Sequence, residues 1–294
     1  MNSDTAERWR RELDGWAPAD ITVGVIGDPV RHSLSPRLHQ AAFEAMGING
    51  RSLPFEVPEG DAPSALDAMR SLGILGLSVT MPHKEAVVAL ADGVTATVAA
   101  LNAANCLVNQ SGHVSAHNTD GDGLVRSLHE EASFDPAGRR VVVLGAGGAA
   151  RSVIEALGRS QVADLAVVNR NQVRAQTAVL VGGPAARVGQ LDDVDDAELV
   201  INATPVGMDG RPGLPTPAES LHAGQTVVDL VYQPLVTDWL EKAEQAKASV
   251  MNGVPMLLHQ AAIQIELWTG QPAPVAAMRT AVAAHMTPPG AAPG

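Results

Sequence analysis

The sequence predicts an α/β fold with two domains. Short apolar runs of β-type composition alternate with longer helix-type segments, a pattern typical of parallel strands joined by helices. Near the middle of the chain a pair of adjoining short strands interrupts this alternation, and a second series of strands and helices then begins. The length of 294 residues is sufficient for two domains.

The predicted strands are apolar runs bounded by turn-forming residues. They are residues 21–27, 53–57, 76–80, 141–144, 165–169, 199–203, 226–230 and a short run near Val250. The predicted helices begin after Pro36, Pro63, Pro82, Gly123, Gly148, Asn171 and Thr237, and a last long helix runs from Pro255 to Trp268.

An antiparallel hairpin is predicted where the alternation breaks. Residues 105–109 and 113–116 are β-type, and Gln110-Ser111-Gly112 separates them. The Gly-rich turn Asp120-Gly121-Asp122-Gly123 follows, and we expect it to form a hinge before the second series of strands.

Composition excludes several classes of protein. The 20 basic and 32 acidic residues give a net charge of −12, which argues against binding to the nucleic-acid backbone. No apolar run is long enough to span a membrane, and residues 1–16 lack the apolar core of a secretory signal. The single cysteine, Cys106, forms no internal disulfide, which favours a reducing, cytoplasmic location. The Pro/Gly-rich tail, 287–294, is expected to be disordered.

A dinucleotide-binding turn is predicted after the strand at 141–144. Gly145, Gly147 and Ala150 fit G-x-G-x-x-G/A, with a strand before the motif and an amphipathic helix after it. Such glycines allow backbone N–H groups to approach a pyrophosphate at a helix N-terminus. The motif favours a Rossmann-type domain with a parallel sheet over a plain tight turn.

The next strand ends at Asn169-Arg170-Asn171, and Arg174 follows. NAD-binding domains usually place an acidic residue here for the ribose 2′-hydroxyl, and this sequence has none. Two arginines at i and i+4 can instead clamp a 2′-phosphate, so NADP is preferred to NAD. The alternative is two solvated surface arginines.

Lys84 is the candidate proton donor. Only three of the 20 basic residues are lysines, and Lys242 and Lys247 lie in a polar helical segment. Lys84 follows Pro82, where a strand is predicted to end and a helix to begin. An ammonium in a first helical turn faces the positive end of the helix dipole, which favours proton release. A surface lysine is the alternative.

Asp120 lies just after the hairpin. Either Asp120 or Asp122 could simply cap the next helix. The spacing of 118, 120, 122 and Gly123 resembles a calcium loop, but its twelfth position is His129 rather than Glu, so calcium is rejected. We expect no metal site.

Ser33 and Ser35 follow the first strand. Ser35 precedes Pro36 and is predicted to be a helix N-cap. Ser33 has no such structural role, and two hydroxyl groups at the carboxyl end of a strand could bind a carboxylate.

Taken together, these motifs resemble the shikimate dehydrogenase family from about Val23 to Trp268. The family's S-x-S-P element matches residues 33–36, its N-V-T-x-P-x-K-E element residues 78–85, its A-x-N-T element residues 103–106 and its D-N-T-D-G element residues 117–121. In the second half, its G-A-G-G-A, N-R-T, N-A-T-P-x-G-M, D-x-x-Y and G-x-x-M-L-x-x-Q elements are similar to residues 145–149, 169–171, 202–208, 229–232 and 253–260.

The resemblance implies an enzyme that reduces 3-dehydroshikimate to shikimate with NADPH. It implies a substrate domain at 1–120, completed by helices at 254–286, and an NADP-binding Rossmann domain at 121–253. Lys84 and Asp120 would be catalytic. A cyclic hydroxy acid would be bound by Ser33, Ser35, Thr80, Asn105, Asp120, Tyr232 and Gln260. NADP would be bound by Gly145, Ala146, Gly147, Gly148, Ala149, Asn169, Arg170, Arg174, Thr204, Leu230 and Gly253. The protein would be a monomer or a homodimer.

Some positions depart from the family pattern. Ser78 replaces the usual Asn, Cys106 the usual Thr, His83 a common aromatic residue, and Val254-Pro255 the usual Leu-Gly. Ser78 and Cys106 are expected to weaken hydrogen bonds around the ring hydroxyls. Quinate or an amino analogue of shikimate is therefore an alternative substrate, and a ligand sensor without catalysis is an alternative class of protein.

Overall fold

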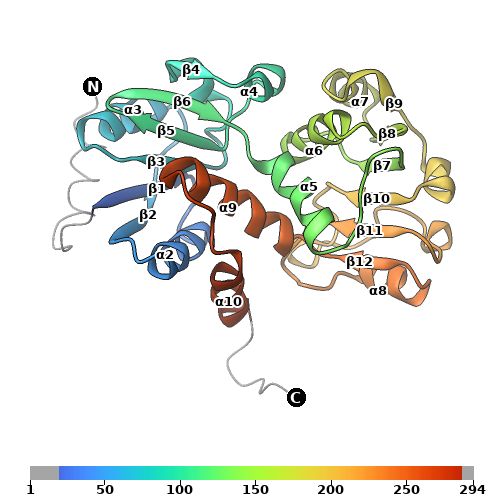
Figure 1. The fold of residues 1–294 in the computed structure, drawn as a ribbon. Coiled ribbons are helices and arrows are strands. Elements are labelled where there is room, and N and C mark those ends of the chain that lie inside the picture. The colour runs from blue at the N-terminus through green and yellow to red at the C-terminus, as the bar shows by residue number, and fades with distance from the viewer. Residues whose placement is uncertain (1–19, 287–294) are drawn as a thin grey trace. The chain divides into compact units, whose positions relative to one another are not determined.

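The computed structural model describes residues 20–286 and divides them into two compact units (Figure 1). The first unit contains the described residues up to Thr119 and those from Ala261 onwards, and the second is Asp120–Gln260. The second boundary falls after Gln260, inside helix α9 (Val254–Thr269), whereas the resemblance implies a boundary at 254, where this helix begins. Our expectations for residues 1–16 and for the tail at 287–294 lie outside the described residues.

The first unit contains a six-stranded mixed sheet in the order β2-β1-β3-β5-β6-β4. The strands are β1 (Ile21–Gly27), β2 (Gly50–Glu56), β3 (Gly76–Val79), β4 (Gly93–Val94), β5 (Cys106–Gln110) and β6 (His113–His117). β1 pairs in parallel with β2 and β3, whereas β5 is antiparallel to both β3 and β6. The predicted hairpin is confirmed. Ser111 and Gly112 form its turn, with φ values of 55° and 94°.

Helices cover both faces of this sheet. α3 (Ala62–Ser71) packs on the face that carries Ile26, Leu77 and Leu107. α2 (Ser35–Ala45) packs against α10 (Val275–Met286) and β2. Trp268 of α9 lies so close to Gly76 that a Cβ atom at this glycine would overlap the indole. The short α4 (Ala96–Leu101) completes the unit.

The α-helix expected after Pro82 is wrong. Only a short 3₁₀ helix, η1 (Ala86–Leu90), forms there, and Lys84 precedes it. The carbonyl of Lys84 accepts a hydrogen bond from Ala104 N–H at 2.8 Å, while Val88 N–H donates to Glu85. Because the Lys84 carbonyl bonds to Ala104 and not to an N–H group four residues later, Lys84 does not lie in the first turn of an α-helix. The helix-dipole argument for Lys84 therefore does not apply.

The second unit contains a fully parallel six-stranded sheet in the order β12-β11-β10-β7-β8-β9. The strands are β7 (Arg140–Leu144), β8 (Asp164–Val168), β9 (Ala186–Val188), β10 (Leu199–Asn202), β11 (Thr226–Asp229) and β12 (Ser249–Met251). Two series run outward from the central pair β7 and β10, which is the strand order of a Rossmann fold. The predicted fold class is confirmed.

Alternate residues of these strands fill two separate cores. Val141 and Val143 face the core with α5 (Asp120–Glu130) and α6 (Gly148–Arg159), whereas Val142 and Leu144 face the core with α8 (Asp238–Gln245). α7 (Gln172–Val179) follows β8.

The Gly-rich turn expected at 120–123 is wrong, since these residues form the first turn of α5, directly after the boundary between the units at Thr119. A Cβ atom at Gly121 would overlap the carbonyl oxygen of Ser152 in α6, and one at Gly123 would lie 2.7 Å from Gln260 N in α9. The glycines therefore allow helices to pack closely. Glycine is also common in flexible turns, so the sequence alone does not distinguish these two roles.

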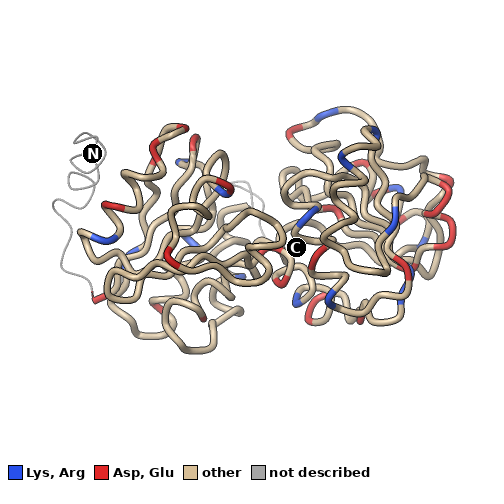
Figure 2. Tube along the Cα trace, turned by 90° about the horizontal axis from the view of Figure 1, so that it is seen from above, with Lys and Arg blue, Asp and Glu red and all other residues tan. Residues whose placement is uncertain are grey.

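Acidic and basic residues are interspersed along both units (Figure 2). Several arginines are paired with carboxylates, among them Arg187 with Asp164 and Asp193, and Arg139 with Glu198. No helix within residues 20–286 is long and apolar enough to cross a membrane.

We expect the buried His39 to make stability depend on pH. The side chain is fully buried, its Nδ1 lies 3.0 Å from Ser52 Oγ, and burial lowers its pKa to about 3. As the pH falls below the ordinary histidine pKa of about 6.5, the unfolded chain binds a proton and the folded chain does not. Stability is therefore present at neutral pH and is lost on acidification. Between pH 7.5 and 5.0 the free energy of unfolding should therefore fall by about 2 kcal/mol more in the wild type than in His39→Asn. Urea unfolding at both pH values measures it, and equal losses in the two proteins would contradict the assignment.

Gly121→Ala should destabilise the protein by about 2 kcal/mol, because the added methyl group overlaps the α6 backbone. At an open helical position the same change would stabilise by up to about 1 kcal/mol. Gly93→Ala is the control, since its nearest contact would be an ordinary 3.6 Å. Thermal unfolding of the two variants measures the difference. Unchanged stability in Gly121→Ala would favour the hinge interpretation instead.

Candidate substrate and cofactor sites

Three segments of the first unit converge at the carboxyl ends of β1 and β3. Thr80 N–H donates to Ile26 O at 2.9 Å, and Asp28 N–H donates to Met81 O at 3.0 Å, so the loops after the two strands lie side by side. Because β5 is antiparallel to β3, its beginning lies at the same edge, where Val79 N–H donates to Asn105 O at 2.8 Å. This arrangement gathers the predicted substrate residues of this unit at one edge of the sheet.

The two serines exchange their expected roles. The N-cap position of α2 is Leu34, with no side-chain cap, so the expectation that Ser35 caps the helix is wrong. Ser33 Oγ instead accepts a hydrogen bond from Ser35 N–H at 3.3 Å, as in a Ser/Thr turn. The Ser35 side chain is 7% exposed and its hydroxyl makes no hydrogen bond with residues 20–286. This hydroxyl can therefore donate to a ligand.

Asn105 is held rigidly beside the Lys84 segment. Its Oδ1 accepts from Thr119 N–H at 2.7 Å, and its Nδ2 donates to Thr119 Oγ1 at 3.0 Å. Gln264 of α9 donates to the Asn105 carbonyl at 3.2 Å, and Ala104 N–H binds the Lys84 carbonyl. Lys84 itself is half-buried. Thr119 and Gln264 support Asn105 through contacts distant in sequence, so no local pattern predicts this role, although Thr119 lies in the motif at residues 117–121.

Ser78 and Cys106, two of the residues that differ from the family pattern, lie next to each other in the sheet. They are direct cross-strand partners in the β3–β5 pair. Cys106 is fully buried, and burial raises the pKa of its thiol, so it is an unreactive packing residue. Ser78 is 6% exposed, and its hydroxyl makes no hydrogen bond with the described part of the chain.

His83 is a structural residue. Its side chain is 1% exposed, and Nε2–H donates to Val57 O at 2.7 Å. The ring therefore packs inside the unit and does not face a substrate as a proton donor.

The Gly-rich turn of the second unit forms an open cradle. Gly145 has φ +117°, and a Cβ atom there would lie 2.8 Å from Ala203 O. In contrast, nothing lies within 4 Å of the Cβ positions of Gly147 and Gly148 at the N-terminus of α6. A glycine turn with open space beside it at a helix N-terminus fits a pyrophosphate group. Ala146 and Ala149 lie in the same turn.

The arginine pair lies on the next strand-to-helix turn. Asn171 caps α7 by accepting from Arg174 N–H at 3.1 Å, and Asn169 Nδ2 donates to the Asn171 carbonyl at 2.8 Å. Arg170 and Arg174 are exposed, and neither guanidinium has a hydrogen bond or an ion pair with residues 20–286. Two guanidinium groups without carboxylate partners fit a phosphate monoester.

The carboxyl ends of β10 and β11 carry Thr204 and Leu230. Thr204 Cγ2 lies 3.4 Å from the Cβ position of Gly145, and a Cβ atom at Gly253 would overlap the Leu230 carbonyl. Thr204 thus lies beside Gly145 and Leu230 beside Gly253, and Leu230 N–H donates to Asn202 O at 3.0 Å, at the edge where a Rossmann sheet binds its ligands. Tyr232 follows β11 with 38% exposure, and burial, together with the charge of Asp209, raises its pKa.

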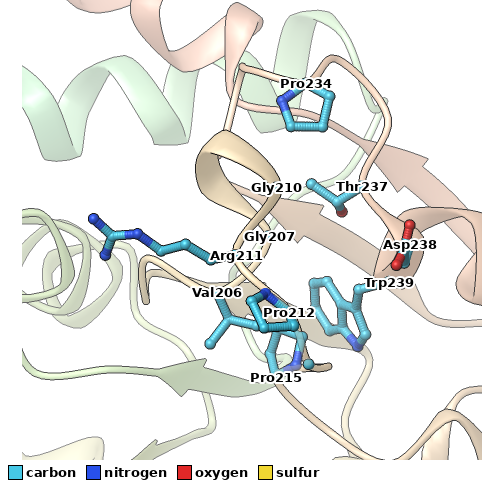
Figure 3. Close-up of a pocket in the computed structure, with 11 residues that line it drawn as sticks. Val206, Gly207, Gly210, Arg211, Pro212, Pro215, Pro234, Thr237, Asp238 and Trp239 are labelled. Atoms are coloured by element: carbon cyan, nitrogen blue, oxygen red, sulfur yellow. The ribbon is translucent and has the colours of Figure 1, made fainter.

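A pocket of about 210 Å³ lies between the loops that follow β10 and β11 (Figure 3). Val206, Pro212, Pro234 and Trp239 form its apolar wall, and the Arg211 guanidinium points away from it.

Asp120 and Gln260 lie in the second unit. Asp120 is the first residue of α5 and is 9% exposed, and Gln260 is 7% exposed with Nε2 donating to Leu257 O at 2.9 Å. Of the predicted catalytic and substrate residues, the first unit thus holds Ser33, Ser35, Thr80, Lys84 and Asn105, and the second holds Asp120, Tyr232 and Gln260. Within residues 20–286 no cluster of three or more His, Cys, Asp or Glu side chains could hold a metal ion.

Family models match three parts of the chain. Residues 25–107 match the shikimate dehydrogenase substrate binding domain, residues 127–206 match shikimate / quinate 5-dehydrogenase, and residues 253–283 match the shikimate 5′-dehydrogenase C-terminal domain.

Individual proteins match nearly the whole chain. The shikimate dehydrogenase (NADP(+)) of Methanopyrus kandleri is 43% identical over 277 residues, which cover 90% of this chain and 95% of the relative. The crystal structure of shikimate 5-dehydrogenase from Thermus thermophilus in complex with NADP(H) and shikimate has a TM-score of 0.83 at 34% identity, covering 90% of this chain and 99% of the other. The structure of quinate dehydrogenase from Corynebacterium glutamicum in complex with NAD has a TM-score of 0.85 at 32% identity, with the same coverage. This chain belongs to the shikimate dehydrogenase family.

Proposed function

We propose that this protein is an NADP-dependent shikimate dehydrogenase, which reversibly reduces 3-dehydroshikimate to shikimate. The observation that carries the proposal is the open glycine cradle at α6 followed by Arg170 and Arg174, whose guanidinium groups have no partner within residues 20–286. Together they provide one site for a pyrophosphate and one for a 2′-phosphate. Relatives named shikimate dehydrogenase (NADP(+)) support the same cofactor.

The substrate residues of the first unit suit a cyclic hydroxy acid. The hydroxyls of Ser33 and Ser35 would bind its carboxylate, and Thr80 and Asn105 would bind ring hydroxyls. On the second unit, Asp120, Tyr232 and Gln260 are proposed to bind the same substrate. Because all of the proposed NADP-binding residues lie in the second unit, we infer that the second unit is the NADP-binding domain and the first is the substrate domain.

The chemistry requires a proton donor in addition to the cofactor. Bound NADPH supplies a hydride to the ring carbonyl. The developing alkoxide then needs a proton and a nearby positive charge, and Lys84 Nζ is proposed to supply both. Asp120 is proposed to fix the reacting hydroxyl through its carboxylate.

A quinate or aminoshikimate dehydrogenase is the second candidate. It is favoured by Ser78, whose shorter side chain replaces the usual Asn and whose hydroxyl has no partner in the described chain. The similarity to a quinate dehydrogenase agrees with it. Comparing kcat/KM for shikimate, quinate and the amino analogue separates the candidates, and the preferred substrate is the one with the highest value.

We predict that 3-dehydroshikimate is reduced with NADPH in clear preference to NADH. Arg170→Ala and Arg174→Ala should each raise KM for NADPH by about tenfold and leave KM for NADH nearly unchanged, because a charge-assisted hydrogen bond is worth about 1.5–3 kcal/mol. Absorbance at 340 nm measures both reactions. Arg139→Ala is the control, since its surface ion pair with Glu198 lies outside the proposed sites. A preference for NADH in the wild type would refute the assignment of the arginines.

Lys84→Ala should lower kcat by about 10²–10⁴-fold while KM for shikimate changes only slightly, because the lost proton transfer acts mainly in the transition state. Lys242→Ala, on the polar helix α8, is the matched control and should retain full activity. Steady-state kinetics in the direction of shikimate oxidation test both variants. Near-normal kcat in Lys84→Ala would exclude the proposed role.

A further inference from the structure

A buried carboxylate joins the ends of β10 and β11. Asp229 is fully buried, and three donors surround it. Its Oδ1 accepts from Asn202 Nδ2 at 2.9 Å and from Val231 N–H at 3.0 Å, and its Oδ2 accepts from Thr237 Oγ1 at 2.8 Å. Within residues 20–286 no lysine or arginine is among its hydrogen-bond partners. The role of this residue is therefore to accept hydrogen bonds.

The hydrogen-bond donors around Asp229 favour its ionised form. Burial raises its pKa, and the hydrogen bonds from Val231, Thr237 and Asn202 oppose that rise. Val231 N–H can only donate. Thr237 Oγ1 already accepts from Leu240 N–H at 3.4 Å, so its proton points to Asp229. The carboxylate accepts all three of these hydrogen bonds at once, whereas a protonated carboxyl group would need Asn202 or Thr237 to give up its role as donor.

The charge of Asp229 fixes the direction of the next hydrogen bonds. Because a carboxylate only accepts, Asn202 must turn its NH₂ group toward Asp229, and the same group donates to Val206 O at 3.3 Å. The Asn202 Oδ1 atom therefore faces Thr204. It accepts from Thr204 N–H at 3.0 Å and from Thr204 Oγ1 at 2.6 Å.

These hydrogen bonds determine whether the Thr204 hydroxyl can donate or accept a further hydrogen bond. Its single hydroxyl proton is used by Asn202, and its oxygen accepts from Val206 N–H at 3.3 Å. The remaining lone pair of Oγ1 can only accept. Thr204 lies beside Gly145, between the central strands β7 and β10, where the strand order reverses and a Rossmann sheet binds its ligand.

We propose that Asp229 and Asn202 are positioning residues that hold Thr204 as a hydrogen-bond acceptor for an amide NH₂ group of the bound cofactor, namely the carboxamide of its nicotinamide ring. The inference rests on the proposed function for the identity of the cofactor. The hydrogen-bond polarity follows from the contacts of Asp229, Asn202 and Thr204 alone.

The test compares NADP⁺ with its 3-acetylpyridine analogue, in which a methyl group replaces the amide NH₂. Isothermal titration calorimetry without substrate should show that the wild type binds NADP⁺ about five- to tenfold more tightly than the analogue. Thr204→Val has nearly the same shape but no acceptor, and should bind both cofactors with similar affinity. Thr280→Val, on α10 of the first unit, is the matched control and should keep the wild-type ratio.

Asp229→Asn tests the positioning role. The neutral amide allows Asn202 to reverse its orientation, so the ratio of the two affinities should fall toward one while far-ultraviolet circular dichroism stays native. A purely structural role would weaken binding of both cofactors equally and leave the ratio unchanged. An unchanged ratio in Thr204→Val would overturn the proposal even if Asp229→Asn failed to fold.

The two hypotheses fail in different ways. If the wild type discriminates between the cofactors as described but does not reduce 3-dehydroshikimate, the proposed substrate is wrong and this inference stands. If the enzyme is active but Thr204→Val retains the wild-type ratio, this inference is wrong and the proposed function stands.

Discussion

The close approach of backbone segments at a few glycines is the constraint on which the proposed site residues of the second unit depend. In the second unit, Gly145 allows the dinucleotide turn to pack against Ala203, and Gly253 allows the start of α9 to pack against Leu230. Gly123 does the same for α5 and α9. In each case a single methyl group would overlap backbone atoms. The polar groups of the site are positioned closely because no side chains separate these segments.

The polar residues near these contacts fall into two groups. Asn105 and Asp229 are enclosed by donors and acceptors of the protein itself, so their orientation is decided before a ligand binds. Ser35, Arg170 and Arg174 have no such side-chain partners within residues 20–286. The proposed ligands are anions and the chain carries a net charge of −12, so long-range attraction does not assist their capture. We therefore expect the donors of Ser35, Arg170 and Arg174 to attract the anionic ligands at short range.

The residues that depart from the family pattern also divide by burial. Cys106 and His83 are enclosed, one as an unreactive thiol and the other by a hydrogen bond to Val57 O. Val254-Pro255 begins α9, where a proline in the first turn is compatible with the helix. Ser78 keeps a hydroxyl that has no partner in the described chain, so it is the departure with the most direct bearing on substrate preference.

The sequence by itself determined the α/β class, the hairpin at 105–116, the Rossmann-type second domain and the position of the dinucleotide turn. These features depend on local periodicity and on glycine spacing, which can be read from the sequence without knowing the tertiary contacts. Short elements such as β4, α4 and β9 escaped prediction because they contain too few residues to show a period. The tertiary structure was needed to show that Asp120–Gly123 is a helical turn rather than a loop and that Ser33 rather than Ser35 supplies the side-chain acceptor at the start of α2. It also decided that Lys84 lies outside an α-helix and that Asp229 orients Asn202. In each of these cases the outcome depends on a partner distant in sequence or on the fold of the surrounding chain, which local pattern does not specify.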